Sequence, residues 1–215
     1  MPEAHVHTLT ASATTSASLS ISVGTPIWLH WLRIAKEQTA LARRGADTTP
    51  SPQSPGDVTT ETAGSVTDEM YPAMVAIAAA AFALDGLYDQ VRGLAPPRPA
   101  KGRPKRQRLI LETLKHAFAI GSYAQRWLVE FDWLDELRDP AVHPEHKTGP
   151  VVAHPSGWGN FAVEYTEYSA DNAERAMALL QEVLRVCVEN PKPASRTWAE
   201  GTGKSALAEM TPAQA

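Results

Sequence analysis

The stretch ELRDPAVHP, residues 136–144, places an arginine, an aspartate and a histidine within six positions. A guanidinium such as that of Arg138 can hold a phosphate through paired hydrogen bonds. The imidazole of His143 belongs to a class of side chain that titrates near neutral pH and can move a proton. Together these groups have the chemistry needed to cleave a phosphodiester. The same residue types also fit a polar loop at the end of a helix.

The spacing of the pair is less informative than its position. In a chain of this length with seven histidines, an Arg-x4-His pair can easily arise by chance. On a regular helix, Arg138 and His143 would point about 140° apart, because each residue turns the helix by about 100°. Pro140 lies between them, disfavours a helical conformation for Asp139 and lacks a backbone donor. We therefore expect the helix to bend at Pro140, which would bring His143 toward Arg138.

A run of basic residues precedes this stretch and is the only strongly basic part of a chain whose net charge is −4. We expect it to bind RNA phosphates, with a solvated linker in front of a helix as the alternative. Its residues are Arg98, Lys101, Arg103, Lys105, Arg106 and Arg108.

Other chemical motifs are weak. The histidines have no companion residues in metal-ligand register, so we expect no metal site and no cofactor. The segment EGTGKS, residues 200–205, ends like a phosphate-binding loop, but Trp198 stands where the first glycine should be. Cys187, the single cysteine, lies on an apolar helical stripe and indicates a packed thiol in a reducing cytoplasm.

Composition changes along the 215 residues predict one domain with ragged ends. Residues 1–25 form a mostly disordered extension in which residues 16–23 alternate like a strand. Residues 26–45 form a helix, and residues 46–65, rich in Pro, Ser and Thr, form a flexible linker. Residues 66–190 carry the main bundle, and the small, polar residues 191–215 are expected to be disordered.

Apolar periodicity predicts the helices of that bundle. One begins near Met70 and runs to Val91, followed by helices around residues 110–118, 127–137 and 171–189. Residues 161–166 alternate as in a strand after the turn SGWGN, which predicts a β-hairpin before the last helix. The expected fold is all-α, a four- to five-helix bundle with this small hairpin. The longest apolar run has 12 residues, too few to span a bilayer of about 20 helical residues, so no membrane is expected.

Over roughly residues 66–190 the chain resembles the HEPN domain, an all-α bundle found in prokaryotic toxins, defence systems and RNA-processing nucleases. The resemblance rests on the order of the helices, on LRDPAVHP, and on YTEYSADNAERA leading into a final helix. HEPN nucleases carry an R-[N/H/D]-x3-H signature, which falls on Arg138, Asp139 and His143. The proline inside the signature, the hairpin and the long N-terminal extension depart from the pattern.

The resemblance implies a metal-independent endoribonuclease in which the ribose 2′-hydroxyl attacks the adjacent phosphate and leaves a 2′,3′-cyclic phosphate. His143 would transfer a proton, Arg138 would hold the phosphate, and Asp139 would orient one of them. It also implies a homodimer that joins two motifs in one cleft, RNA as substrate, and a toxin or defence role with a cognate antitoxin or defence partner.

Two alternatives belong to other classes of protein. HEPN members without nuclease activity exist, so the chain could be a non-catalytic HEPN-like bundle that serves as an RNA-binding or protein-interaction module. A third reading is a generic bundle that binds a small ligand between its helices.

Overall fold

A computed structural model describes residues 26–48, 60–94, 104–142, 151–153 and 160–210. Its long helices are α1 (Ile27–Thr48), α2 (Thr60–Leu94), α4 (Ala124–Val142) and α6 (Ala170–Glu189), with α3 (Arg106–Ala117) between α2 and α4. The short elements are β1 (Val151–Ala153), β2 (Asn160–Ala162), α5 (Val163–Glu167), η1 (Pro193–Ser195), α7 (Arg196–Trp198), η2 (Ala199–Gly203) and α8 (Lys204–Met210). The described residues are almost entirely helical, which confirms the all-α prediction.

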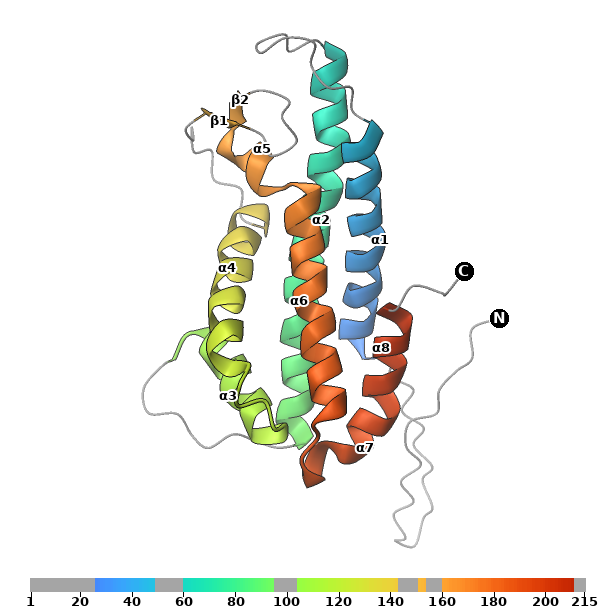
Figure 1. The fold of residues 1–215 in the computed structure, drawn as a ribbon, viewed down its shortest axis with the longest axis vertical. Helices are drawn as coiled ribbons and strands as arrows, with labels where there is room; N and C mark the ends of the chain where they lie inside the picture. The colour runs from blue at the N-terminus through green and yellow to red at the C-terminus, as the bar shows by residue number, and fades with distance from the viewer. Residues whose placement is uncertain (1–25, 49–59, 95–103, 143–150, 154–159, 211–215) are drawn as a thin grey trace, which may run out of the picture.

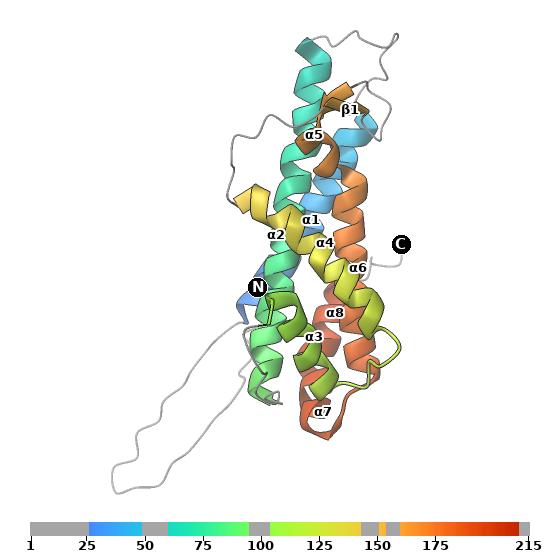
Figure 2. The same cartoon turned by 90° about the vertical axis from the view of Figure 1, so that its left-hand side faces the viewer.

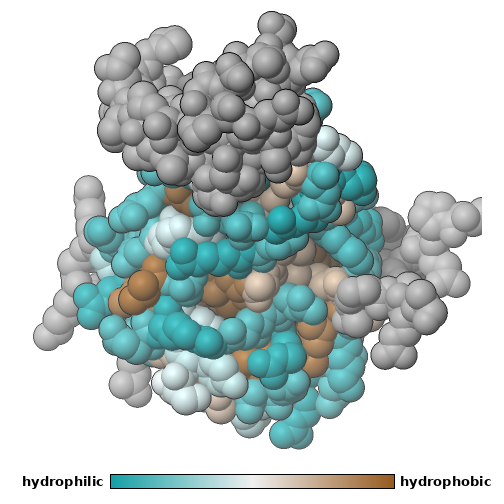
Figure 3. Space-filling model, turned by 45° about the horizontal axis from the view of Figure 1, so that its top comes forward, coloured by the Kyte–Doolittle hydropathy of each residue, from teal (hydrophilic) through white to brown (hydrophobic). Residues whose placement is uncertain are grey.

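Helix α2 is the central element of the bundle. It contacts α1, α3, α4 and α6, and the long helices run antiparallel to their neighbours in the chain (Figures 1 and 2). Its buried face is lined by small residues, including Ala73, Ala76, Ala80 and Ala83, which let the neighbouring helices approach closely. By length and composition, Thr67–Leu94 is also apolar enough to cross a membrane, but half of its apolar window is buried inside the bundle. The surface seen in Figure 3 is mainly hydrophilic, with hydrophobic residues in patches.

Helix α1 belongs to the same core as the rest of the bundle. Trp28 and Leu32 are each only 1% exposed, and a Cβ on Gly86 of α2 would lie 2.6 Å from the Cβ of Trp28. Close packing of α1 on α2 therefore depends on that glycine. The predicted boundaries are wrong at this point: α1 continues to Thr48 and α2 begins at Thr60, so both ends of the predicted linker 46–65 are helical. The centre of that linker, like residues 1–25, lies outside the described residues.

The C-terminal segment is a second correction. Residues 191–215 were expected to be disordered, but the chain from Pro193 to Met210 forms consecutive helical turns, and only residues 211–215 lie outside the described part. Trp198, Ala206 and Met210 are buried, and Arg33 of α1 binds Glu209 with both contacts at 2.8 Å. The segment EGTGKS lies within η2 and α8, so it forms helix rather than a phosphate-binding loop.

The region before α6 contains less β-strand than expected. Strands β1 and β2 pair antiparallel, with Val152 opposite Phe161. The strand ends at Ala162, and Val163–Glu167 forms α5, so the strand predicted over residues 161–166 is wrong from residue 163 onward. Helix α6 then begins after Ser169, whose side chain caps it by accepting from the backbone N–H of Asn172.

Candidate functional site

The predicted catalytic arginine lies at the edge of the core. The buried stripe of α4, which includes Phe131, Leu134 and Leu137, fixes the face that packs against the bundle. Asp135 and Arg138 each follow a residue of that stripe, so both lie where α4 meets α2 and α3. Arg138 is therefore partly buried, with 23% of its side chain exposed.

Three carboxylates surround the Arg138 guanidinium. Its Nε and Nη2 donate to Oδ1 of Asp139 at 3.2 and 2.7 Å. Nη2 also lies 3.0 Å from Asp135, and Nη1 lies 3.4 Å from Asp85 of α2. All three nitrogens of the guanidinium are thus engaged, on three sides, by negative charge.

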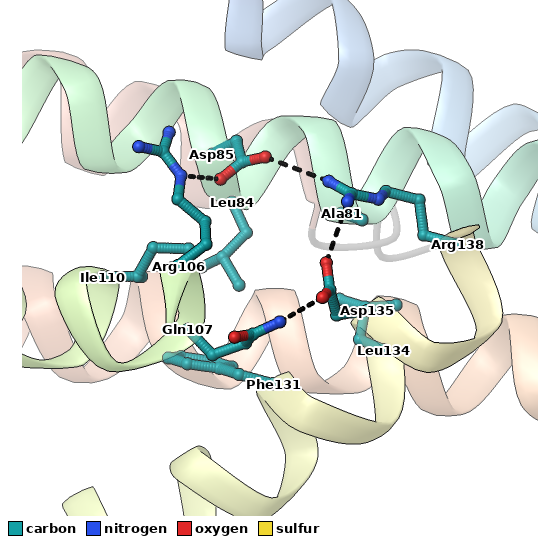
Figure 4. A pocket seen from close by; sticks show the side chains of 10 residues that line it. All are labelled: Ala81, Leu84, Asp85, Arg106, Gln107, Ile110, Phe131, Leu134, Asp135 and Arg138. Atoms are coloured by element: carbon teal, nitrogen blue, oxygen red, sulfur yellow. Dashed lines mark hydrogen bonds and ion pairs between the residues drawn. The ribbon is translucent and has the colours of Figure 1, made fainter. Parts of the chain in front are cut away.

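Asp85 joins this arginine to a second one (Figure 4). Arg106, the first residue of α3, places Nε 2.7 Å from Asp85 and Nη2 3.6 Å from Asp89. Its guanidinium also lies 4.2 Å above the ring of Tyr88, a favourable cation–π arrangement. Two arginines therefore share Asp85, which bridges the start of α3 and the end of α4.

Gln107 completes the cluster. Its side-chain amide donates to Asp135, and 7% of the residue is exposed. The pocket that these groups surround has about 270 Å³ of empty space, part of it open solvent. Its floor is apolar and is lined by Ala81, Leu84, Ile110, Phe131 and Leu134. The cluster is thus a polar rim placed over the core (Figure 4).

Burial and charge shift the titration of this cluster. Burial of the Arg138 guanidinium works against its charged form, but the hydrogen bond to Asp139 and the nearby carboxylates outweigh it, so the pKa of Arg138 lies above its ordinary value. Burial raises the pKa of Asp135, and the charge of Arg138 offsets only part of this effect. Four carboxylates, those of Asp85, Asp89, Asp135 and Asp139, face the two guanidiniums, so the ionised cluster carries a net charge of −2.

The structure brings together only part of the predicted site. Arg138 and Asp139 are in contact, whereas His143 lies outside the described residues. Helix α4 is not interrupted at Pro140 but continues to Val142. The expected approach of His143 to Arg138 lies outside the described residues. A proline near the end of a helix removes one late hydrogen bond, and here the helix accommodates that loss.

The predicted phosphate-binding residues divide into three groups. Arg98, Lys101 and Arg103 lie outside the described residues. Lys105 and Arg108 are exposed at the start of α3, where a phosphate can reach them. Arg106 instead points into the pocket and is paired with Asp85, so a phosphate would have to compete with that carboxylate for its guanidinium.

Sequence reasoning missed Asp85, Asp135 and Gln107. The pairing of Asp135 with Arg138 could have been predicted from the sequence, because the two residues are three positions apart on a helix. Asp85 is the first charged residue after the apolar run of α2. That position suggests a special role, but the sequence does not indicate which residue Asp85 contacts. Among the residues that the structure describes, no group of three or more His, Cys, Asp or Glu side chains could hold a metal ion.

Comparison of the chain with protein-family models, with curated protein sequences and with solved structures gave no match. The fold and the polar cluster are therefore the basis for any functional proposal.

Proposed function

We propose that the chain is a non-catalytic bundle of HEPN-like type that acts as a protein-interaction module. Arg138 acts as a structural link between α4 and α2 rather than as a phosphate ligand. The observation that carries the proposal is the engagement of all three guanidinium nitrogens of Arg138 by Asp85, Asp135 and Asp139.

The charge around Arg138 argues against phosphate binding. A catalytic arginine stabilises the charge that develops on phosphate oxygens, and this requires donors that are free to turn toward the substrate. Here a phosphate would have to displace carboxylates and approach a cluster with a net charge of −2. The negative charge of a phosphate bound at Arg138 would be repelled by these carboxylates, most strongly where solvent screening is reduced. This argument disfavours RNA as the partner at this position and leaves protein as the better one.

The metal-independent endoribonuclease is the second candidate, and one observation favours it. Asp139 accepts two hydrogen bonds from Arg138, as expected for a residue that orients the catalytic arginine. In this candidate His143 transfers the proton, Lys105 and Arg108 help to hold RNA, and two copies form the cleft. A cytoplasmic toxin or defence effector with a cognate antitoxin or defence partner belongs to this candidate.

An RNA cleavage assay in EDTA distinguishes the two candidates. The wild-type chain, Arg138→Ala and His143→Ala are incubated with the same structured and unstructured RNAs. We expect all three to leave the RNA intact. Wild-type cleavage that yields 2′,3′-cyclic phosphate ends and is lost in His143→Ala would overturn the proposal and establish the nuclease.

A structural role for Arg138 also predicts a loss of stability. Arg138→Met leaves Asp135 and Asp139 without their cation and Asp85 with Arg106 alone, so we expect the free energy of unfolding to fall by about 1 kcal/mol at neutral pH. The residues are partly exposed, which keeps the effect small. Urea denaturation followed by circular dichroism measures the change.

Arg92→Met is the control, because Arg92 is an exposed arginine in the last turn of α2, another helix of the bundle. We expect a change within about 0.5 kcal/mol for this variant. Equal or higher stability of Arg138→Met would contradict the structural role, since removal of a functional charge often stabilises a protein.

A further inference from the structure

An exposed apolar stripe runs along α2. Tyr71, Val75, Ala78 and Phe82 follow one another at intervals of four, three and four residues, which places them on one side of the helix. Tyr71 and Val75 are exposed, and Ala78 and Phe82 are half-buried. The twelve residues from Tyr71 to Phe82 contain no charged side chain. The stripe is about 17 Å long, because a helix rises by about 1.5 Å per residue.

Helix α1 lies beside α2 and contributes a second stripe (Figure 1). Ile27, Trp31, Ile34 and Leu41 are spaced by four, three and seven residues, and Ile27 and Leu41 are exposed. The rings of Trp31 and Phe82 are in contact, with centroids 5.0 Å apart. The two stripes therefore join into one surface, which we call the α1–α2 face and define by the residues of both stripes.

The sequence shortly before α1 has a regular pattern of its own. The stretch SASLSISV, residues 16–23, lies outside the described residues. Ala17, Leu19, Ile21 and Val23 alternate with serines, so an extended conformation puts these four side chains on one side and the serines on the other. Such a segment has one side suited to an apolar surface and one side suited to water.

We propose that residues 16–23 of this chain cover the α1–α2 face. The two match in length, because an extended chain spans about 20 Å from Ala17 to Val23, close to the length of the α2 stripe. They also match in charge, since residues 8–25 contain no charged side chain. The inference does not rest on the proposed function, because Arg138 and its carboxylates are not part of this face.

The segment is tethered next to the face. Only Gly24, Thr25 and Pro26 separate it from Ile27, and Gly and Pro are residue types that favour a reversal of the chain. A reversal at these residues directs the segment along α1 toward Leu41, over the face. A short tether of this kind gives an effective concentration of about millimolar, so a weak contact is enough to hold the segment.

The paired strands β1 and β2 are the other described surface that an alternating segment could join. They lie at the far end of α1 from Ile27 (Figure 1). Helix α1 has 22 residues and is therefore about 33 Å long, a distance that an extended chain covers with about ten residues. Residues 16–25 are those ten, so little of the segment would be left to pair with the hairpin.

The size of the face also favours a short segment over a second folded chain. The longer stripe, from Ile27 to Leu41, is about 22 Å long, and two helices side by side are about 20 Å wide, which gives about 440 Å². Two such faces would bury about 900 Å² together, below the range of about 1,200–2,000 Å² for specific interfaces between proteins. One extended segment with four apolar side chains suits an area of this size.

The test is disulfide formation within the full-length chain. Leu19→Cys and Val75→Cys together place one thiol in the segment and one in the face, and we expect mild oxidation to join them within one chain. Non-reducing gel electrophoresis and mass spectrometry measure the rate. The native Cys187 does not compete, because it is fully buried. Val75 is an exposed position, so circular dichroism should show an unchanged helical content.

Leu19→Cys with Glu37→Cys is the matched control. Trp28 lies beside Gly86, and from that level Val75 is about 17 Å along α2 and Glu37 about 14 Å along α1. Glu37 is exposed on the side of α1 opposite its buried residues, outside the face. A tether without docking reaches both positions, so a docked segment should make the Val75 pair form about tenfold faster or more than the Glu37 pair.

Ile21→Asp and Val23→Asp, added to the Leu19→Cys and Val75→Cys chain, remove apolar contacts and keep the tether. We expect them to slow the reaction to the rate of the Glu37 pair, because a carboxylate is disfavoured on an apolar surface. Equal rates for the Val75 and Glu37 pairs, or a rate unchanged by the aspartates, would overturn the proposal. Disulfides between chains, with twice the chain mass of 23.3 kDa, would assign the face to a second copy and also overturn it. Binding of the wild type to phosphatidylcholine vesicles, lost in Val75→Asp, would assign the face to lipid with the same consequence.

Discussion

Replacing Trp198 by alanine is expected to lower the free energy of unfolding by about 3–5 kcal/mol, the usual cost of truncating a buried aromatic side chain. Trp198 is 6% exposed, and its ring lies 5.3 Å from the ring of Phe118 between centroids. A Cβ on Gly203 would lie 3.1 Å from the same indole, so the chain packs closely on both sides. Loss of the ring leaves a cavity that these neighbours cannot fill without moving.

The indole nitrogen adds a polar contribution. Oε1 of Gln90 accepts hydrogen bonds from both Trp28 and Trp198, each at 2.8 Å. One side chain of α2 therefore ties α1 to the C-terminal helices. Trp198→Phe keeps most of the apolar area and loses only one of these bonds, so we expect a smaller loss of about 1 kcal/mol.

Urea denaturation followed by circular dichroism checks both substitutions. Val129→Ala, at an exposed position of α4, should change the free energy of unfolding by no more than about 0.5 kcal/mol. Wild-type stability in Trp198→Ala would show that the C-terminal helices do not contribute to the fold, and would restore the original prediction of a disordered tail.

The helices with regular apolar periodicity could be predicted from the sequence. The periodicity predicts α6 over residues 171–189, and the helix spans Ala170–Glu189. Its predicted stripe is buried at Ala173, Leu180, Leu184 and Cys187 and half-buried at Met177. Burial of one face of a helix leaves a local pattern, because every third or fourth residue must be apolar.

The C-terminal helices leave no such pattern. They are short, and the residues of 191–215 are mostly small or polar. What holds Trp198 in place is Phe118 and Gln90, which are far away in the chain. Short helices of this kind are stabilised by tertiary contacts rather than by their own propensity, so composition alone predicted disorder.

The candidate site could be predicted only where it is local. Arg138 and Asp139 are adjacent in the chain, and their pairing follows from that fact. Asp85 is 53 positions from Arg138, and no local rule joins them. A proline disfavours a helical conformation of the preceding residue without excluding it, and the packed stripe of α4 holds the helix through Pro140 to Val142.

The second large effect is expected at Glu69, a carboxylate buried between α2 and α6 with 1% exposure. Its Oε1 accepts the backbone N–H of Ala170 at 2.6 Å, at the first turn of α6. That N–H has no acceptor within its own helix, so a side chain must supply one. We expect Glu69→Ala to lower the free energy of unfolding by about 1–3 kcal/mol, because it leaves a buried donor without an acceptor.

Glu69 also makes stability depend on pH. Burial raises the pKa of Glu69 above its ordinary value of 4.5, and the hydrogen bond from Ala170 offsets only part of this effect. The folded chain therefore binds the proton more tightly than the unfolded chain. Stability should fall as pH rises from 4.5 through the raised pKa, and should gain on acidification over the same window.

Glu69→Gln separates the charge from the hydrogen bond. The amide oxygen can still accept from Ala170, but no carboxylate ionises, so this variant should lack the part of the pH slope that Glu69 contributes. Asp135 also has a raised pKa, but it is present in both chains and cancels from the difference. Urea titrations at several pH values should show the stability of Glu69→Gln gaining on that of the wild type as pH rises through the window. A constant difference between the two chains would show that Glu69 titrates at its ordinary pKa and that burial does not disfavour its charge.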